Sequence, residues 1–272
     1  MNNNVRFPFR FFLITFMWSW IIWTPLILAS HKIIPVSENI LSILTIPVIM
    51  IGVYGPLVGA LFALHKEKGK GSAKVYLRSF LDFRLGWKVY ILSIFIFGGS
   101  TFIAWFFPEL FGEERLPMLL PSIWVFIPYL LIMILLGGGQ EEFGWRGYAL
   151  PILESKFGIW FANIIIGIIW ATWHIPLWFI TGTSQTYMNF GGFILLMIGY
   201  SFILSWIREI SGNRPFSGLY VHGLFNAFIP LMPPLIMQKN SSQPRFWIWV
   251  ILTLLIGIII TLLRKKSMTQ YK

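Results

Sequence analysis

Eight runs of apolar residues divide this chain of 272 residues, and most of them are long enough to cross a lipid bilayer. A transmembrane helix needs about 20 such residues to span roughly 30 Å of hydrocarbon. Only 11% of the residues are charged, whereas a soluble domain carries about a quarter. The runs occupy residues 11–28, 40–64, 89–107, 123–150, 159–180, 190–207, 219–237 and 246–263. We therefore expect an all-α, polytopic membrane helical bundle with about eight transmembrane helices.

The basic residues fall unevenly between these runs. If the N-terminus is cytoplasmic, only four of the 21 Lys and Arg residues fall in outer segments, which leaves seventeen for the inner ones. The four are Lys32, Arg115, Lys239 and Arg245. The positive-inside rule then predicts cytoplasmic N- and C-termini in a multi-pass protein of the cell membrane. The net charge of +11 is thus assigned to the inner membrane surface rather than to nucleic acid.

The first run raises the question of a cleaved leader. A signal peptide has an apolar region of about 7–15 residues, and residues 11–28 exceed that length. We therefore expect a retained helix. The Lys-rich stretch 66–74 is interpreted as an inner-face loop that helps to set the topology.

Two adjacent carboxylates, Glu141 and Glu142, lie with Arg146 inside the fourth apolar run. An ionised side chain costs about 2.5–3.5 kcal/mol at the centre of a membrane helix, so such residues usually mark a functional site. Residues four apart share a helix face, which predicts that Arg146 neutralises Glu142. Glu141 points about 100° away and stays free to handle a proton. Taken alone, these residues could equally be a charged pair that ends the fourth helix at the cytoplasmic face.

The histidines argue against that plain interpretation. His31 and His65 lie at loop edges, whereas His174 and His222 lie inside apolar runs. Each of the latter two has a polar or aromatic partner four residues away, Trp170 for His174 and Asn226 for His222. A single membrane histidine often only bonds to a neighbouring helix. Three motif-bearing runs together favour one shared site.

Such a set of side chains suits the hydrolysis of a carbonyl compound. A carboxylate can act as general base on a water, an imidazole can orient that water, and an amide can donate to an oxyanion. Other hydrolytic sites are excluded by missing residues. Asp82 is the single aspartate, there is no cysteine, and neither a His-Glu-x-x-His nor a Gly-x-Ser-x-Gly motif occurs.

Three motifs, in order, resemble those of the CPBP family, the intramembrane proteases of CAAX and bacteriocin processing, also called Abi. The family pattern is Glu-Glu-x-x-x-Arg, an aromatic residue followed four positions later by His, and His-x-x-x-Asn. Here Trp170 stands where Phe is more common. The matching segments are Glu141-Glu142-Phe-Gly-Trp-Arg146, Trp170-Ala-Thr-Trp-His174 and His222-Gly-Leu-Phe-Asn226.

The resemblance implies a membrane bundle of about eight helices and an endopeptidase activity on a membrane-associated peptide or protein, of the CAAX or the peptide-maturation class. Glu141 would activate water, supported by Glu142, which Arg146 holds. His174 would share the water or a metal, and His222 with Asn226 would bind the oxyanion. Two His and one Glu can also bind zinc, so a zinc ion on Glu141, His174 and His222 and a metal-free water stay as alternatives. We expect one membrane domain over residues 1–272, with its motif-bearing core at about 123–237.

Glu142 and His174 must lie at the same depth in the membrane if they share one site. If the fourth helix ended at Glu142, His174 would lie some 20 Å away, at 1.5 Å per residue. We therefore expect a helix that runs without interruption from near Ile123 past Glu142 to about Leu150.

Two other function classes stay open. One is a non-catalytic scaffold or immunity protein that regulates a partner, and the other is a small-solute transporter, which would normally contain an internal repeat.

Overall fold

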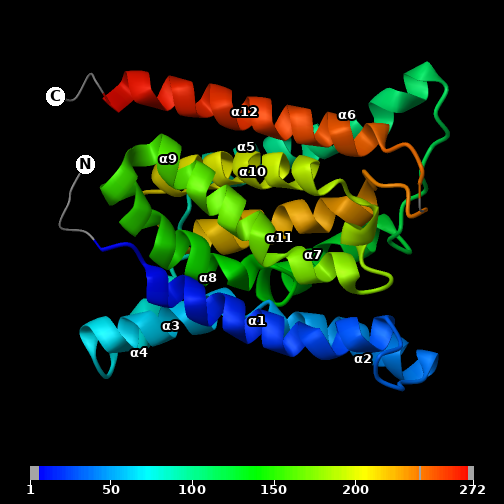
Figure 1. Cartoon of the computed structure of the whole chain (residues 1–272). Helices are drawn as coiled ribbons and strands as arrows, with labels where there is room; N and C mark the ends of the chain where they lie inside the picture. The colour runs from blue at the N-terminus through cyan, green and yellow to red at the C-terminus, as the bar shows by residue number, and fades with distance from the viewer. Residues whose placement is uncertain (1–5, 239, 269–272) are drawn as a thin grey trace.

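The computed structural model describes residues 6–238 and 240–268, with only the backbone described for 265–268. In these ranges every regular element is helical (Figure 1), which confirms the predicted all-helical membrane bundle. Of the basic residues used for the topology, Lys239 and Lys272 lie outside the described residues, and the side chains of Lys265 and Lys266 are not described.

Within the described residues, six helical stretches are long and apolar enough to cross a membrane. They are Phe9–Ser30, Glu38–Lys68, Trp87–Phe111, Ile123–Phe179, Phe190–Ile210 and Pro244–Arg264. The predicted number of eight is not confirmed by this criterion. The fourth and fifth runs fall in one stretch of 57 residues, and the seventh forms only the 16-residue α11 (Phe216–Leu231).

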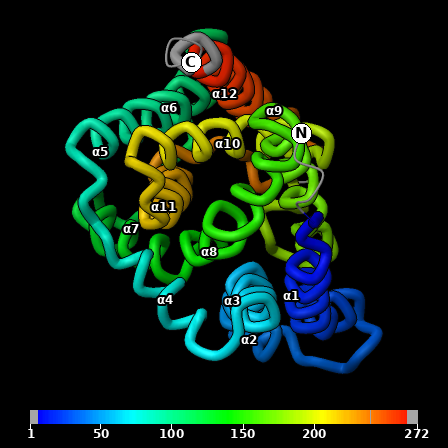
Figure 2. The backbone as a smooth tube through the Cα atoms, turned by 90° about the vertical axis from the view of Figure 1, so that its left-hand side faces the viewer, coloured from blue at the N-terminus to red at the C-terminus, as the bar shows by residue number. Residues whose placement is uncertain are grey.

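Three N-terminal helices form a group beside the rest of the bundle. α1 (Phe9–Ser30) packs along α2 (Glu38–Gly52) and α3 (Gly55–Lys68) (Figure 2). The close approach of α3 to α1 depends on small residues, because a Cβ added at Gly59 would overlap the backbone and side chains of α1. α3 then contacts the helix that carries the glutamates.

The motif-bearing helices form the centre of the molecule. α11 is surrounded by α7 (Phe126–Leu135), α8 (Glu142–Gly144), α10 (Phe190–Ile210) and the π-helix η1 (Ile94–Gly98) (Figure 2). α12 (Pro244–Met268) packs on α10 and on α6 (Gly99–Phe106). The remaining helices are α4 (Ser72–Ser79), α5 (Trp87–Ser93) and α9 (Leu150–Trp173), with short 3₁₀ or π segments at Phe107–Phe111, Ile123–Val125, Gly139–Glu141, Trp145–Ala149, Ile175–Phe179 and Ser184–Tyr187.

The predicted uninterrupted helix from Ile123 to Leu150 is wrong at one place. α7 ends at Leu135, Leu136 leaves the helical region, and Gly138 adopts a φ of +125°. Helical structure resumes at Gly139 and continues past Glu142, as expected, through Phe157. The physical reason is the sequence Gly137-Gly138-Gly139, since glycine reaches positive φ without a steric penalty. The break lies directly before the two glutamates.

A second glycine turns the chain back after the glutamates. Gly158 has φ +76° and ψ +169°, which separates α9 into two helices. The second of these ends at Trp173, and His174 follows as its C-cap. His174 therefore returns to the depth of the glutamates, as the sequence argument required.

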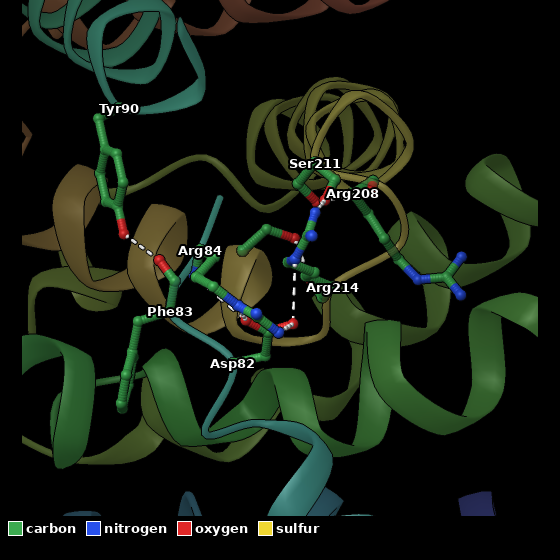
Figure 3. Close-up of polar contacts among 8 residues, drawn as sticks. Asp82, Phe83, Arg84, Tyr90, Arg208, Ser211 and Arg214 are labelled. Carbon is green, nitrogen blue, oxygen red and sulfur yellow. Dashed lines mark hydrogen bonds and ion pairs between the residues drawn. The ribbon is translucent and has the colours of Figure 1, made fainter. Parts of the chain in front are cut away.

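Charged side chains join the helices at the end of the bundle that carries α4. Asp82, between α4 and α5, accepts from Arg84 at 2.8 Å and from Arg214 at 3.1 Å, while Arg208 points away from it (Figure 3). Arg214 lies just before α11, so the single aspartate links the loop after α4 to the helix that carries His222. The guanidinium of Arg84 holds the pKa of Asp82 well below its usual range.

Candidate active site

Glu142 is fully buried behind the site and is neutralised there by two cationic or hydrogen-bonding groups. Its Oε1 accepts from Nη1 of Arg146 at 2.9 Å and from Nδ1 of His222 at 2.8 Å. The predicted i, i+4 pair between Glu142 and Arg146 is therefore present. Isolated burial of any of these charges would be costly, so the three side chains form one interdependent unit.

Glu141 is held in another way, by two indole groups. Its Oε2 accepts from Nε1 of Trp170 at 2.8 Å and from Nε1 of Trp145 at 3.4 Å. The indole nitrogen can only donate, so both contacts favour an acceptor oxygen at this position. No formal positive charge faces this carboxylate in either bond, in contrast to Glu142.

Trp170 connects the two carboxylates. The guanidinium carbon of Arg146 lies 4.4 Å from the centroid of its ring, a cation–π distance. The ring of His222 approaches it edge-on, with centroids 5.3 Å apart. One side chain thus donates to Glu141 and also packs on the arginine that holds Glu142.

The two remaining motif residues line the site from neighbouring helices. Nδ1 of His174 donates to the carbonyl oxygen of Trp170 at 2.8 Å, which leaves Nε2 of the neutral ring as an acceptor. Nδ2 of Asn226 donates to the carbonyl oxygen of Gly137 at 2.6 Å. One of its two amide hydrogens is thereby used at the helix break, and the other stays available.

Gly138 allows the break to approach α11 closely. A Cβ at this position would lie 2.5 Å from Nε2 of His222 and 2.5 Å from Nδ2 of Asn226. Such distances are too short for real side chains, and the positive φ also disfavours them. The glycine therefore brings the backbone against the predicted oxyanion residues.

A cavity of about 250 Å³ lies in front of these residues. Glu141, Trp170, His174, His222 and Asn226 line it, whereas Glu142 and Arg146 do not. The rest of the lining is mostly apolar and comes from α2, α10, α11, α12 and the segment after α9. All six predicted site residues thus lie around one place. Four of them line the cavity together with Trp170, and Glu142 and Arg146 form the wall behind it.

Zinc binding by Glu141, His174 and His222 stays a prediction. In the part of the chain that the structure describes, no three His, Cys, Asp or Glu side chains are grouped closely enough to hold a metal ion. Nδ1 of each histidine is also used, by Glu142 and by a backbone carbonyl. As the side chains lie, they do not fit a three-ligand site.

The donors to Glu141 were not predicted from the sequence. Trp145 occupied an unassigned position of the first motif, and Trp170 was noted only as the aromatic residue four positions before His174. A signal was available for Trp145, which follows Glu141 by four residues and so shares its helix face. For Trp170 the signal was the replacement of Phe by an aromatic residue with an N–H group.

Comparisons with known proteins match the segment of the chain that contains these residues. Residues 122–228 match the family model described as type II CAAX prenyl endopeptidase Rce1-like. A protein named CAAX prenyl protease 2 from Methanococcus maripaludis is 32% identical over 108 residues, which cover 37% of this chain and 39% of that protein. Lysostaphin resistance protein A from Staphylococcus haemolyticus is 25% identical over 178 residues, 61% of this chain and 44% of that protein.

The chain spans less than half the length of either relative. The matched segment nevertheless contains the two glutamates, Arg146, both membrane histidines and Asn226. The three motifs and the family match fall in the same segment: residues 122–228 of this chain are similar to the type II CAAX prenyl endopeptidase Rce1-like family, in agreement with the family resemblance that the motifs predicted.

Proposed function

We propose that the protein is an intramembrane endopeptidase that hydrolyses a peptide bond of a membrane-associated peptide or protein. The observation that carries this proposal is the placement of Glu141 on a cavity together with His174, His222 and Asn226. The family match and the relative named as a CAAX prenyl protease support the same reaction class. The substrate would belong to the CAAX or the peptide-maturation class.

Glu141 is the general base in this mechanism. Its Oε2 is held by two indoles, so Oε1 is the oxygen that can take a proton from a water in the cavity. Nε2 of His174 accepts the second hydrogen of that water and orients it. The water oxygen attacks the peptide carbonyl carbon as its proton passes to Glu141.

The oxyanion that forms needs donors already in place. The free amide hydrogen of Asn226 is one, and Nε2–H of a protonated His222, stabilised by Glu142, is the other. When the carbon–nitrogen bond breaks, Glu141 returns its proton to the leaving amine. Glu142 and Arg146 take no part in the transfer; they hold His222 and Trp170 in position.

A second candidate is a resistance function that needs no cleavage. The relative from Staphylococcus haemolyticus is named a lysostaphin resistance protein, and its match covers more of this chain than the protease match does. A scaffold that regulates a partner would retain the fold but would not require the base. A transporter has no comparable observation in its favour.

The test is peptide cleavage by the purified protein in liposomes. We would present membrane-anchored peptides, with and without a prenylated C-terminus, and analyse products by mass spectrometry. Wild type is expected to release defined fragments, and Glu141→Gln to release at least about 10²-fold less, since a general base contributes about 10²–10⁴. Glu154→Gln, an acidic residue that does not line the cavity, is the matched control. No cleavage at all would favour the second candidate, whereas equal cleavage by wild type and Glu141→Gln would remove Glu141 from the mechanism.

A further inference from the structure

The catalytic cavity extends toward one end of the bundle. Ser184, Gln185 and Met188, from the segment between α9 and α10, line it on that side. Met188 also lines a second hollow of about 570 Å³, formed by residues 186–189 and by residues around the start of α12. The two hollows therefore share one side chain, which places the second hollow beside the cavity that Glu141 lines.

The second hollow has a distinctive lining. It presents hydroxyl and amide groups beside aromatic rings, and its described lining contains no charged side chain. The members are Thr186, Tyr187, Met188, Asn189, Gln238, Asn240, Ser241, Ser242, Gln243, Pro244, Phe246 and Trp247. Amides and hydroxyls can both donate and accept, which matches the alternating N–H and C=O groups of an extended peptide.

In the opposite direction, the glutamates are separated from the surface by close packing. Trp145, Leu150 and Leu153, which follow the glutamates in the chain, are fully buried. The hydroxyl of Tyr76 on α4 donates to the carbonyl oxygen of Phe143, and the ring of Phe80 lies 4.1 Å from that of Phe143, centroid to centroid. Aromatic and backbone contacts thus close this side immediately beside Glu142.

Charged contacts close the same end further out. Oε1 of Glu154 accepts from Ser205 at 2.8 Å, and Arg208 and Arg264 each lie 3.9 Å from this carboxylate. Asp82 and Arg214 add the contact in Figure 3. This closed end is also the end of α4 and of the Lys-rich stretch 66–74, which the positive-inside rule assigns to the cytoplasm.

The open side lies at the other end. The amide of Thr181 donates to Oγ of Ser30, the last residue of α1, at 3.2 Å. Figure 1 shows the start of α12 at the right-hand end and α4 at the left-hand end. The hollows therefore lie at the end of the helices opposite to α4 and the Lys-rich stretch 66–74.

We propose that the substrate reaches Glu141 from the extracytoplasmic side and that the second hollow binds an extended stretch of it beside the scissile bond. This inference rests on the proposed endopeptidase function. It narrows the substrate class to peptides or protein segments exposed at the outer leaflet.

The experiment uses the absence of cysteine from the chain. Four single-cysteine variants are made. Gln185→Cys and Ser184→Cys place a thiol at the mouth of the cavity, the second with almost no change in side-chain shape, and Ile229→Cys places one within the cavity. Ser79→Cys places a thiol at an exposed position of α4. The probe is a charged, membrane-impermeant thiol reagent, added to intact cells or to inverted vesicles. Because a charge does not cross the hydrocarbon readily, labelling reports the side from which each thiol is reached.

The mouth and cavity variants are expected to react at least about tenfold faster in intact cells than in inverted vesicles, and Ser79→Cys to show the reverse, because the reagent stays on its own side. Faster labelling of Gln185→Cys or Ile229→Cys from the cytoplasmic side would overturn the inference. This readout needs no proteolysis. If the labelling is as expected but no peptide is cleaved, the proposed function fails; if cleavage occurs but access is cytoplasmic, only the sidedness fails.

Discussion

The cavity and the wall behind it use the same residue type in opposite ways. In the wall, Glu142 is 0% exposed and bonds to an arginine and a histidine. On the cavity, its chain neighbour Glu141 is 3% exposed and bonds to two uncharged indoles. The difference teaches that the contacts of each glutamate, and not its position in the motif alone, determine its role. The charge of Glu142 is neutralised by its partners, whereas Glu141 keeps one oxygen that can accept a proton.

The largest effect should follow from removing the arginine that pairs with Glu142 in the wall behind the cavity. Arg146→Ala leaves Glu142 as a buried charge with only His222 beside it, and it removes the cation from the face of Trp170. We expect a loss of about 3–5 kcal/mol in the free energy of unfolding, as for other broken buried pairs. Thermal melts in detergent measure it. Restoration of part of that loss by adding Glu142→Gln would support the pairing, and a wild-type melt for Arg146→Ala would contradict it.

On the cavity side, Asn226→Ala should reduce turnover by about 10²–10³, the usual cost of a lost oxyanion donor. Its bond to the carbonyl of Gly137 predicts a smaller accompanying loss of stability of about 1 kcal/mol. Asn163→Ala, which removes a buried amide from α9 away from the cavity, is the control and should retain turnover. Normal kinetics in Asn226→Ala would remove this residue from the mechanism.

The indole donor between the two regions should matter less. Trp170→Phe keeps an aromatic ring for Arg146 but loses the N–H that bonds to Glu141. Because Trp145 still donates, we expect a roughly tenfold loss in kcat, about 1.4 kcal/mol. The pH profile of kcat is expected to move as well, since the hydrogen bond favours the carboxylate form of the base. An unchanged rate and profile would show that Trp170 serves only packing.

The smallest effect is expected far from both regions, at Asp82. Its pKa is lowered in the folded protein, first by the hydrogen bond from Arg84. A lowered pKa gives stability that is present above the unfolded value of about 3.9 and is lost as pH falls toward the folded value. Asp82→Asn should therefore lower the Tm slightly at pH 7, and the difference from wild type should become smaller as the pH is lowered below about 3.9. A difference that does not change with pH would refute the ionic contribution.

Sequence patterns predicted the helical class correctly. They also singled out six residues that the fold brings to one place, because burial of charge in apolar runs is rare and informative; the roles of these residues stay a prediction. Sequence patterns failed at Leu136–Gly138, where hydropathy stays compatible with a helix but glycine permits a break. They also failed to find α11 as a short helix, because the apolar run continues to Met237 although the helix ends at Leu231. Hydropathy measures burial in lipid and does not register backbone geometry.

The pairing of side chains was harder to predict than their presence. The i, i+4 rule placed Arg146 on Glu142, but the partners of Glu141 and the second contact of Glu142 come partly from other helices. Trp170 and His222 reach the glutamates across 29 and 80 residues of sequence. Such contacts depend on how the helices pack, which no spacing in one chain reveals.

The most direct test of the contrast between wall and cavity compares Glu141→Gln with Glu142→Gln. Both changes remove one negative charge and keep the shape of the side chain. Peptide cleavage and thermal melts are measured on the same preparations. Glu141→Gln should lose turnover by at least about 10²-fold with a wild-type melt, while Glu142→Gln should lower the melting temperature because it leaves Arg146 uncompensated. Equal effects of the two changes on both measurements would contradict the division of roles.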